Sequence, residues 1–298
     1  RVTEAGGKVG SLLRLEARAL GAAPAALLRL TRDTATRVAD TLERFVEHPE
    51  QTPELPDAQI LGSAPPTPFN ASITSARAWA YTDLPIAPSK PVRRRTGTTV
   101  NDILMAATAG GLRQWLIEHD ALTDHPLISL VPMAMTGPSR RAGSNAFTLG
   151  LCPIPTHLPT PAERLAFAHD AMNHAKSEPT YPTALIDDVS MLTGPTVTQL
   201  FTQAAARLRL ADMVRLPFNL MISNVPAPAA RFQVGGGANI VGTYPFPPLS
   251  DGLGLMVCTQ GYAGALGVGV GSCPDLLPDP DHLRDLIVAE HDALVALG

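Results

Sequence analysis

Between residues 98 and 119, apolar residues recur at steps of three and four, which is the spacing of one face of an α-helix. Thr98 or Thr99 can cap the first turn, and the negative charge of Asp102 complements the helix dipole there. The middle of the segment consists of small residues, namely Ala106, Ala107, Ala109, Gly110 and Gly111. Each glycine in a helix costs about 1 kcal/mol relative to alanine, so we expect another backbone to pack closely there. The pattern predicts a central core helix.

Two nearly continuous apolar runs, Leu127–Met135 and Ala146–Ile154, have the pattern of strands that are buried on both faces. Shorter apolar runs predict further strands at Ala76–Leu84, Phe218–Asn224, Ala238–Tyr244, Leu253–Gly261 and Ala265–Gly271. Helical spacing returns at Pro161–Lys176, Pro195–Leu210 and Asp281–Leu297. Because strands and helices do not alternate strictly, we predict a mixed-sheet α/β sandwich rather than a doubly wound fold.

The first part of the chain has a different pattern. Residues 9–47 have helical spacing that is broken at Gly21 and Pro24. Residues 48–70 hold six prolines, a density that excludes helices and strand pairing and predicts an extended linker. We therefore predict a helical and proline-rich connector at residues 1–64 and one domain at residues 65–298.

Composition narrows the class of protein. Hydrophobic residues make up 45% of the 298 residues and charged residues 17%, which is too apolar for a disordered chain. The net charge of −4 gives no general attraction to nucleic acid, so we expect no nucleic-acid partner. No apolar run approaches the ~20 residues of a membrane span. The first 30 residues lack the pattern of a secretory signal and begin with Arg1, so we expect a fragment of a longer, cytoplasmic protein.

The three cysteines, Cys152, Cys258 and Cys273, are odd in number and widely spaced, which fits neither a metal site nor a disulfide framework. A reducing compartment fits this pattern best. Cys152 and Cys258 lie in apolar, strand-like runs with no basic residue nearby, so we expect small hydrophobic side chains rather than nucleophiles. We predict no bound metal and no covalently bound cofactor.

Candidate chemistry is sparse. No standard hydrolase, metalloprotease or nucleotide-binding motif occurs, and none of the eight histidines has a carboxylate or second histidine at the spacing of a site. We therefore interpret the histidines as surface residues. The basic run Arg93–Arg95 allows a phosphate site, but no glycine-rich cradle adjoins it, which favours a solvated run of charge.

Two loops place polar groups where a strand ends, a common position for residues that line a cleft. These groups belong to Ser223 and Asn224 in one loop and to Ser250, Asp251 and Gly252 in the other. The same residue types also favour turns for backbone reasons, so a purely structural role is the alternative. Asn101 and Asp102, at the start of an otherwise apolar helix, likewise either cap that helix or shape a site.

The sequence from Thr99 to Ala107, Thr-Val-Asn-Asp-Ile-Leu-Met-Ala-Ala, resembles the Asn-Asp motif of the bacterial wax ester synthase/diacylglycerol acyltransferase family of the actinobacterial type. Other segments resemble the carboxy-terminal half of that family in the same order, namely Pro65–Asn70, Val131–Met133, Pro159–Leu165, Asn219–Pro228, Pro248–Gly252 and Asp279–Asp281. The resemblance covers residues 65–298. The chain departs from the family pattern at Ala227, where glycine is usual, and at Met133-Ala134, where Val-Arg is usual.

This resemblance implies a chloramphenicol-acetyltransferase-like fold and transfer of an acyl group from acyl-CoA to diacylglycerol or a long-chain alcohol, which makes triacylglycerol or wax esters. The catalytic motif of the family, His-His-x-x-x-Asp-Gly, lies in an amino-terminal domain and does not occur in this sequence. Its second histidine would act as general base on the acceptor hydroxyl. The resemblance therefore implies a chain with no catalytic residue of its own, inactive alone, whose partners are a separate amino-terminal domain, acyl-CoA and a lipid acceptor.

In the same way, the resemblance implies that Asn101 and Asp102 order the wall of the active site. The candidates for substrate binding are Ser223, Asn224, Ser250, Asp251 and Gly252. Peripheral association with a membrane or a lipid inclusion would suit such substrates. A hypothesis of a different class is a non-catalytic domain of the same fold that binds lipid or acts as a scaffold, and the sequence is consistent with both.

Overall fold

The computed structural model describes residues 64–134, 147–177, 181–182, 206–213, 216–226, 228 and 231–298. The chain divides into two units, and all the elements below belong to the unit formed by Ile60–Thr183 and Leu208–Gly298. The predicted connector helices and most of the predicted helix Pro195–Leu210 lie outside the described residues. The boundary between residues 64 and 65 stays a prediction.

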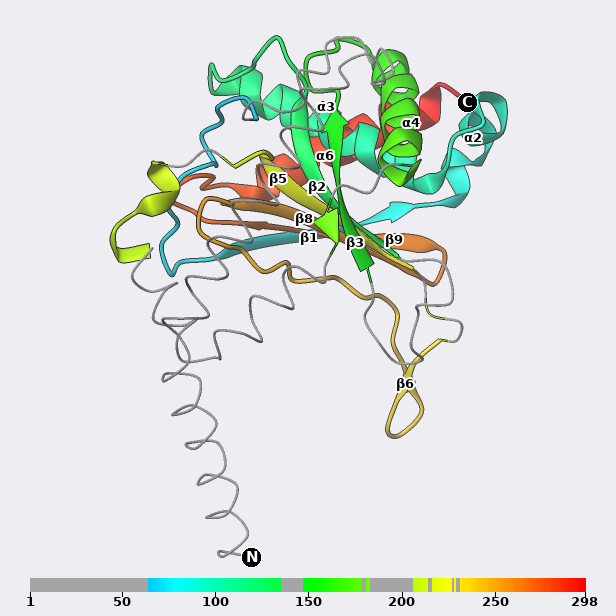
Figure 1. The fold of residues 1–298 in the computed structure, drawn as a ribbon. Helices are drawn as coiled ribbons and strands as arrows, with labels where there is room; N and C mark the ends of the chain where they lie inside the picture. Colours follow the sequence, from blue (N-terminus) through cyan, green and yellow to red (C-terminus); the bar gives the residue numbers. More distant parts are fainter. Residues whose placement is uncertain are drawn as a thin grey trace, which may run out of the picture. The chain divides into compact units, whose positions relative to one another are not determined.

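The described unit is built on one mixed sheet of seven strands in the order β1-β9-β8-β5-β2-β3-β4 (Figure 1). The strands are β1 Ala78–Pro85, β2 Leu127–Ala134, β3 Phe147–Ile154, β4 Tyr181–Pro182, β5 Leu220–Val225, β8 Leu255–Tyr262 and β9 Ala265–Ser272. β5 is parallel to both β2 and β8, while every other neighbouring pair is antiparallel. The predicted mixed sheet is confirmed.

Helices α3, α4 and α6 cover one face of the sheet (Figure 1). The α-helices are α2 Lys90–Thr96, α3 Val100–Glu118, α4 Pro161–Ser177 and α6 Pro280–Ala296, and two short 3-10 helices span Ala87–Ser89 and Leu210–Asp212. α3 is the predicted central helix, and thirteen of its residues, from Asp102 to Leu116, are buried. A Cβ on Gly111 would lie 2.8 Å from the backbone nitrogen of Ile287 in α6, which confirms the predicted close approach of a second backbone.

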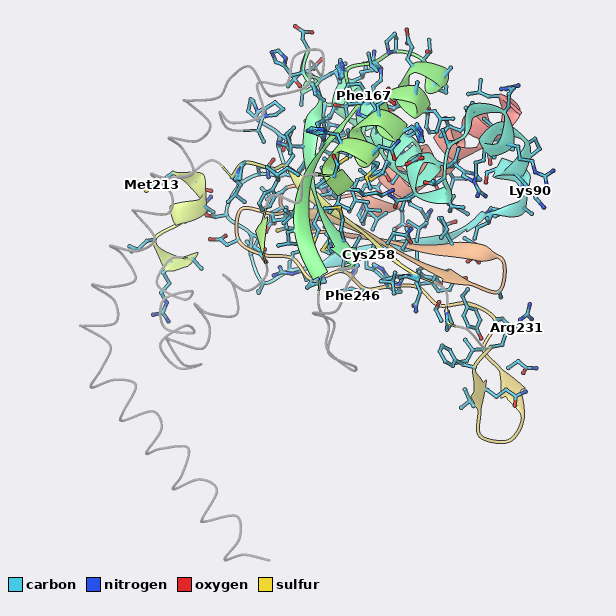
Figure 2. All side chains as sticks on the ribbon, turned by 45° about the vertical axis from the view of Figure 1, so that its right-hand side comes forward. Lys90, Phe167, Met213, Arg231, Phe246 and Cys258 are labelled. Carbon is cyan, nitrogen blue, oxygen red and sulfur yellow. The ribbon has the colours of Figure 1, made fainter. Side chains whose placement is uncertain are left out.

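The opposite face of β9 is covered by an extended segment rather than by helices. A Cβ on Gly267 would lie 1.9 Å from the carbonyl oxygen of Thr243, and one on Gly269 would lie 1.8 Å from that of Pro245. The indole Nε1 of Trp79 in β1 donates to the same Pro245 carbonyl at 3.1 Å. Phe246, in this segment, lies on the side of the sheet away from Phe167 of α4 (Figure 2). Residues 243–247 therefore lie directly on the sheet.

Two sequence predictions need correction. The predicted strand Ala238–Tyr244 is wrong in extent, because β7 covers only Ala238–Asn239 and pairs with β6, Gln233–Val234, around a turn with positive φ at Gly236 and Gly237. The rest of the predicted strand lies in no ladder of the described sheet. Helix α2 was not predicted, since its basic residues suggested a solvated run.

None of the helices in the described ranges is both long and apolar enough to cross a membrane.

Candidate functional site

The start of α3 is closed by a capping box. The Thr99 hydroxyl accepts a hydrogen bond from the backbone N–H of Asp102 at 3.3 Å, and the backbone N–H of Thr99 donates to Asp102 Oδ2 at 2.8 Å. Thr99, one of the two predicted caps, is therefore the N-cap residue. The pairing satisfies two N–H groups that have no partner within the helix, and it fixes the side chain of Asp102 in a buried position.

The same Asp102 oxygen also binds the neighbouring helix. His169 of α4 places its Nδ1 2.8 Å from Asp102 Oδ2, although the Asp102 side chain is only 1% exposed and that of His169 is 30% exposed. The other ring nitrogen of His169, Nε2, lies 3.2 Å from the amide nitrogen of Asn173. Asp102 Oδ1 is buried and has no hydrogen-bond partner among the described residues. Asp102 thus ties the first turn of α3 to α4.

Among the described residues, the sequence interpretation of the histidines as surface residues without a carboxylate partner holds for the exposed His119 and His125 and is wrong for three others. His169 has a carboxylate partner, and so does His282, whose Nε2 lies 2.6 Å from Glu118 Oε2. His291 is not a surface residue, because it is buried in α6. The first two pairs join residues of different helices, so spacing along the chain gave no sign of them.

Asn101 connects α3 to the sheet, whereas Asp102 connects it to α4. Thr259 Oγ1 donates to Asn224 Oδ1 at 2.9 Å, and Asn224 Nδ2 donates to Asn101 Oδ1 at 3.4 Å. Asn224 and Thr259 stand opposite each other in the parallel pair of β5 and β8, where Asn224 lies near the carboxyl end of β5 and Thr259 lies in the middle of β8. No partner for Asn101 Nδ2 occurs within the described ranges, and Asn101 and Asn224 are half-buried. The chain of hydrogen bonds therefore ends on a donor that a ligand can use.

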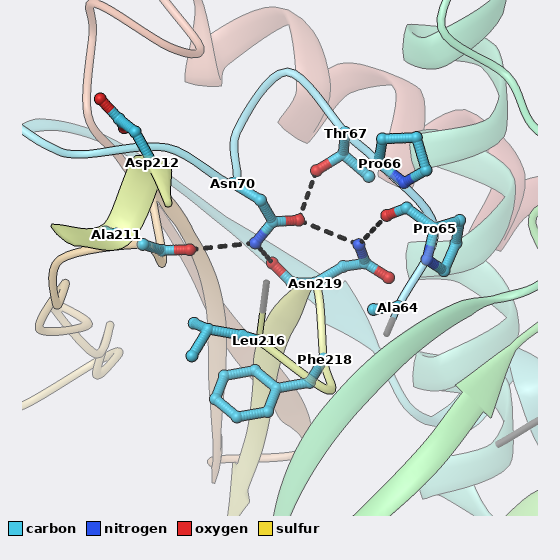
Figure 3. Close-up of a pocket in the computed structure, with 11 residues that line it drawn as sticks. Ala64, Pro65, Pro66, Thr67, Asn70, Ala211, Asp212, Leu216, Phe218 and Asn219 are labelled. Atoms are coloured by element: carbon cyan, nitrogen blue, oxygen red, sulfur yellow. Dashed lines mark hydrogen bonds between the residues drawn. The ribbon is translucent and has the colours of Figure 1, made fainter. Parts of the chain in front are cut away.

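The loop with Ser250, Asp251 and Gly252 lies against residues 70–73, away from Asn101 and Asn224. Its Gly252 carbonyl accepts a hydrogen bond from Asn70 Nδ2 at 3.0 Å, and Asp251 Oδ1 accepts one from the backbone N–H of Ile73 at 3.0 Å. This loop borders a cavity of about 130 Å³ whose polar wall is made by Asn70 and Asn219 (Figure 3). Asn219 Nδ2 donates to Asn70 Oδ1 at 2.9 Å.

The structure therefore divides the predicted site residues into two groups. Asn219 precedes β5 and Gly252 precedes β8, whereas Asn224 and Thr259 are paired within these parallel strands, each at the fifth residue of its strand. Asn224 lies five positions after Asn219, which corresponds to about 16 Å at the usual rise per residue of a strand. Asn101 and Asp102 lie with Asn224, whereas Ser223, the preceding residue of β5, faces the other side of the sheet, and Ser250 to Gly252 do not join them. Sequence reasoning missed His169, Thr259, Asn70 and Asn219.

The buried thiols agree with their expected role as hydrophobic side chains. All three cysteines are free and buried. Burial raises the pKa of the Cys152 thiol to about 12, with the nearby Asp102 carboxylate adding to the effect, and burial raises the pKa of Cys258 to about 11. Thiols with such pKa values are almost fully protonated near neutral pH and are poor nucleophiles. Within the part of the chain that the structure describes, no group of three or more potential metal ligands gathers.

Two family models match this chain. Residues 143–294 match the WS/DGAT C-terminal domain, and residues 5–104 match the wax ester synthase/diacylglycerol acyltransferase catalytic domain. The chain belongs to the wax ester synthase/diacylglycerol acyltransferase family. The predicted family is thus confirmed, and the match to the catalytic-domain model begins at residue 5, before the residues 65–298 to which the resemblance was assigned.

Relatives and a solved structure support the same assignment. One Mycobacterium tuberculosis protein named as a diacylglycerol O-acyltransferase is 36% identical over 241 residues, covering 77% of this chain and 47% of its own. A second, the probable diacylglycerol O-acyltransferase tgs2, also of Mycobacterium tuberculosis, is 33% identical over 232 residues, which cover 76% of this chain and 48% of tgs2. The wax ester synthase/diacylglycerol acyltransferase of Marinobacter aquaeolei VT8 superposes with a TM-score of 0.58 at 26% identity, covering 78% of this chain and 51% of that one. This confirms the predicted fold class. The chain spans about half the length of these relatives.

Proposed function

We propose that this chain forms part of an acyl-CoA-dependent O-acyltransferase that makes triacylglycerol or wax esters. The acyl group would pass from acyl-CoA to the hydroxyl of diacylglycerol or of a long-chain alcohol. The observation that carries the proposal is the hydrogen-bond chain from Thr259 through Asn224 to Asn101, at the motif that marks the family. The names of the mycobacterial relatives and of the Marinobacter protein support it.

In this proposal Asn101 and Asp102 form a wall of the active site and do not transfer protons. Asp102 is buried, and its Oδ2 already accepts hydrogen bonds from Thr99 and His169, so it is suited to holding the first turn of α3 in place. Asn101 then presents toward substrate its Nδ2 donor, which has no partner among the residues that the structure describes. Asn224 is hydrogen-bonded to Asn101 and is the predicted substrate-binding residue that we retain for this role, whereas Ser223, the preceding residue of β5, faces the other side of the sheet.

The general base would come from outside these 298 residues. An alcohol needs a positioned base, which contributes roughly 10²–10⁴ in rate. His169 is the histidine nearest the Asn-Asp pair in the hydrogen-bond network, yet both of its ring nitrogens have protein partners. We therefore propose that a His-His-x-x-x-Asp-Gly segment of an amino-terminal domain completes the site, and that the enzyme works in the cytoplasm at the surface of a membrane or lipid inclusion.

The test is an assay of CoA release from palmitoyl-CoA with hexadecanol or diacylglycerol as acceptor. The 298-residue chain is assayed alone and after addition of a polypeptide that carries the His-His motif. We expect turnover only in the mixture. Turnover by the chain alone would contradict the assignment of the base, and lipid binding without turnover in either sample would favour the non-catalytic alternative.

A further inference from the structure

A cavity of about 510 Å³ lies beside α2, and three cationic side chains gather at it. Lys90, Arg93 and Arg94 stand at positions i, i+3 and i+4 of this helix, so they share one face. Thr98 and Gly264, the latter in the turn between β8 and β9, add to the lining. Figure 2 shows Lys90 at the outer edge of the structure, where a ligand can reach it.

These positive charges have no counter-charge in the described part of the chain. Lys90, Arg93 and Arg94 form no ion pair and no side-chain hydrogen bond there, and the Nε of Arg93 is buried without an acceptor. Arg95, the next residue along, instead donates to the carbonyl oxygen of Leu297. Because the chain as a whole carries a net charge of −4, a concentration of unpaired cations is a local feature rather than a general property of its surface.

A purely structural explanation accounts for only part of this arrangement. Basic residues in the last turn of a helix complement its dipole, which would explain Arg93 to Arg95. Lys90, however, is the first residue of α2, where the dipole disfavours a cation. The dipole also gives no reason for burying the Nε of Arg93 without an acceptor, since an unsatisfied buried donor is destabilising.

We infer that this cavity binds the phosphate group of a phosphorylated ligand. Guanidinium groups donate paired hydrogen bonds to phosphate oxygens, and an ammonium group adds a mobile positive charge, which is the donor set that Arg93, Arg94 and Lys90 supply. The phosphate has two possible sources, a nucleotide such as the 3′-phosphorylated adenosine of coenzyme A or the headgroup of an anionic lipid. Only the first source rests on the proposed acyl-CoA chemistry.

The experiment measures binding by the 298-residue protein without any turnover. The probes are inorganic phosphate, adenosine 3′,5′-bisphosphate, and phosphatidylcholine vesicles with or without phosphatidic acid. We expect the bisphosphate or the acidic vesicles to bind, and inorganic phosphate to compete with whichever binds. The double variant K90Q/R94Q changes two exposed residues and should weaken binding by about tenfold or more. The variant R93Q should weaken it as well.

R95Q is the matched control, because it removes one charge from the same helix without touching the lining of the cavity. Its affinity should stay within about twofold of the unchanged protein, since an exposed charge outside the site is screened by salt. Binding of the bisphosphate alone would identify a nucleotide as the source, and binding of acidic vesicles alone would identify a lipid headgroup. Absence of binding by every probe, or equal weakening by R95Q and K90Q/R94Q, would overturn the inference. Neither result would bear on the CoA-release assay.

Discussion

At the scale of single residues, one oxygen atom of Asp102 accepts hydrogen bonds from two different parts of the structure. Its Oδ2 closes the capping box with Thr99 and accepts the hydrogen bond from His169. We expect Asp102→Ala to lower the free energy of unfolding by about 1–3 kcal/mol, because a lost cap costs ~1 kcal/mol and two buried or half-buried donors lose their acceptor. Urea denaturation would measure this change. The control is Asp170→Ala, an exposed position in α4, which should change stability by less than about 0.5 kcal/mol.

Replacing Asp102 by asparagine separates structure from catalysis. The side-chain oxygen of asparagine can still cap α3, so Asp102→Asn should retain most of the stability and a measurable part of the turnover in the complemented enzyme. If the variant folded normally and yet lost turnover as completely as an enzyme without its His-His motif, Asp102 would have a direct chemical role. That result would contradict the proposed wall function.

Contacts between residues close in sequence could be predicted, whereas contacts between distant residues could not. The cap at Thr99 was predictable because Thr99 and Asp102 are three residues apart and the capping box is a local pattern. The pair of His169 and Asp102 spans 67 residues and depends on how α4 packs beside α3. The side chains of Asn224 and Thr259 meet only because β5 and β8 are neighbours in register.

At the scale of elements, the packing of α3 on α6 requires glycine at position 111. A methyl group there would lie 2.8 Å from the backbone nitrogen of Ile287, and a backbone can give way only if the whole helix shifts. We expect Gly111→Ala to destabilise the protein by about 1–3 kcal/mol through overpacking, although alanine gains about 1 kcal/mol in helix propensity. Thermal or urea unfolding would measure the change. Gln114→Ala, at an exposed position of the same helix, is the control, and an equally small effect at Gly111 would show that the helices separate easily.

The strands that hold Cys152 and Cys258 allow a test of their burial. Because the pKa values are raised to about 12 and about 11, these thiols should not react with a disulfide reagent at pH 8 while the protein is folded. The thiolate fraction grows as pH rises toward these values, so labelling should become faster above about pH 10 or on addition of urea. Colorimetric titration of thiols would follow it. Rapid labelling of Cys152 at pH 8 in the folded protein would contradict the burial of β3.

Elements with a clear repeat of apolar residues were predictable from the sequence. Segments whose conformation depends on contacts with distant parts of the chain were not. The predicted helix from 98 to 119 corresponds to α3, and the runs at Leu127–Met135 and Ala146–Ile154 correspond to β2 and β3. The segment around Tyr244 also has an extended pattern, but it lies across the glycines of β9 instead of joining a ladder. A single sequence contains the glycines at 267, 269 and 271 but does not say which segment fills the space beside them.

At the scale of the whole molecule, strand direction decides which polar loops belong together. Ser223 with Asn224 and Ser250 with Gly252 have similar composition, so the sequence made both loops candidates for one cleft. In the structure β5 and β8 run parallel, and Ser223 and Asn224 lie within β5 toward its carboxyl end, whereas Ser250 to Gly252 precede the amino end of β8. The order and direction of strands come from long-range pairing, which local patterns do not encode.

The two ends of these strands should therefore respond differently to substitution. Asn219 is buried and its side chain makes three hydrogen bonds, donating to the Pro65 carbonyl and to Asn70 Oδ1 and accepting from the N–H of Ile128. Asn219→Ala leaves these groups unpaired, so we expect a loss of about 2–4 kcal/mol in unfolding free energy. The kcat/KM of the folded, complemented enzyme should change little, because this end would not contact substrate.

Asn224→Ala should differ from Asn219→Ala in its effect on activity. It leaves the hydroxyl of buried Thr259 without its acceptor, so we expect a loss of about 1–3 kcal/mol in unfolding free energy. It would also release Asn101, and kcat/KM should fall by about tenfold, the effect of losing one well-placed hydrogen bond in the transition state. Unfolding curves and CoA-release kinetics on the same two variants make the comparison. If Asn219→Ala lowered kcat/KM while Asn224→Ala left it unchanged, the substrate would lie at the Asn70 cavity, and the wall at the start of α3 would have only a structural role.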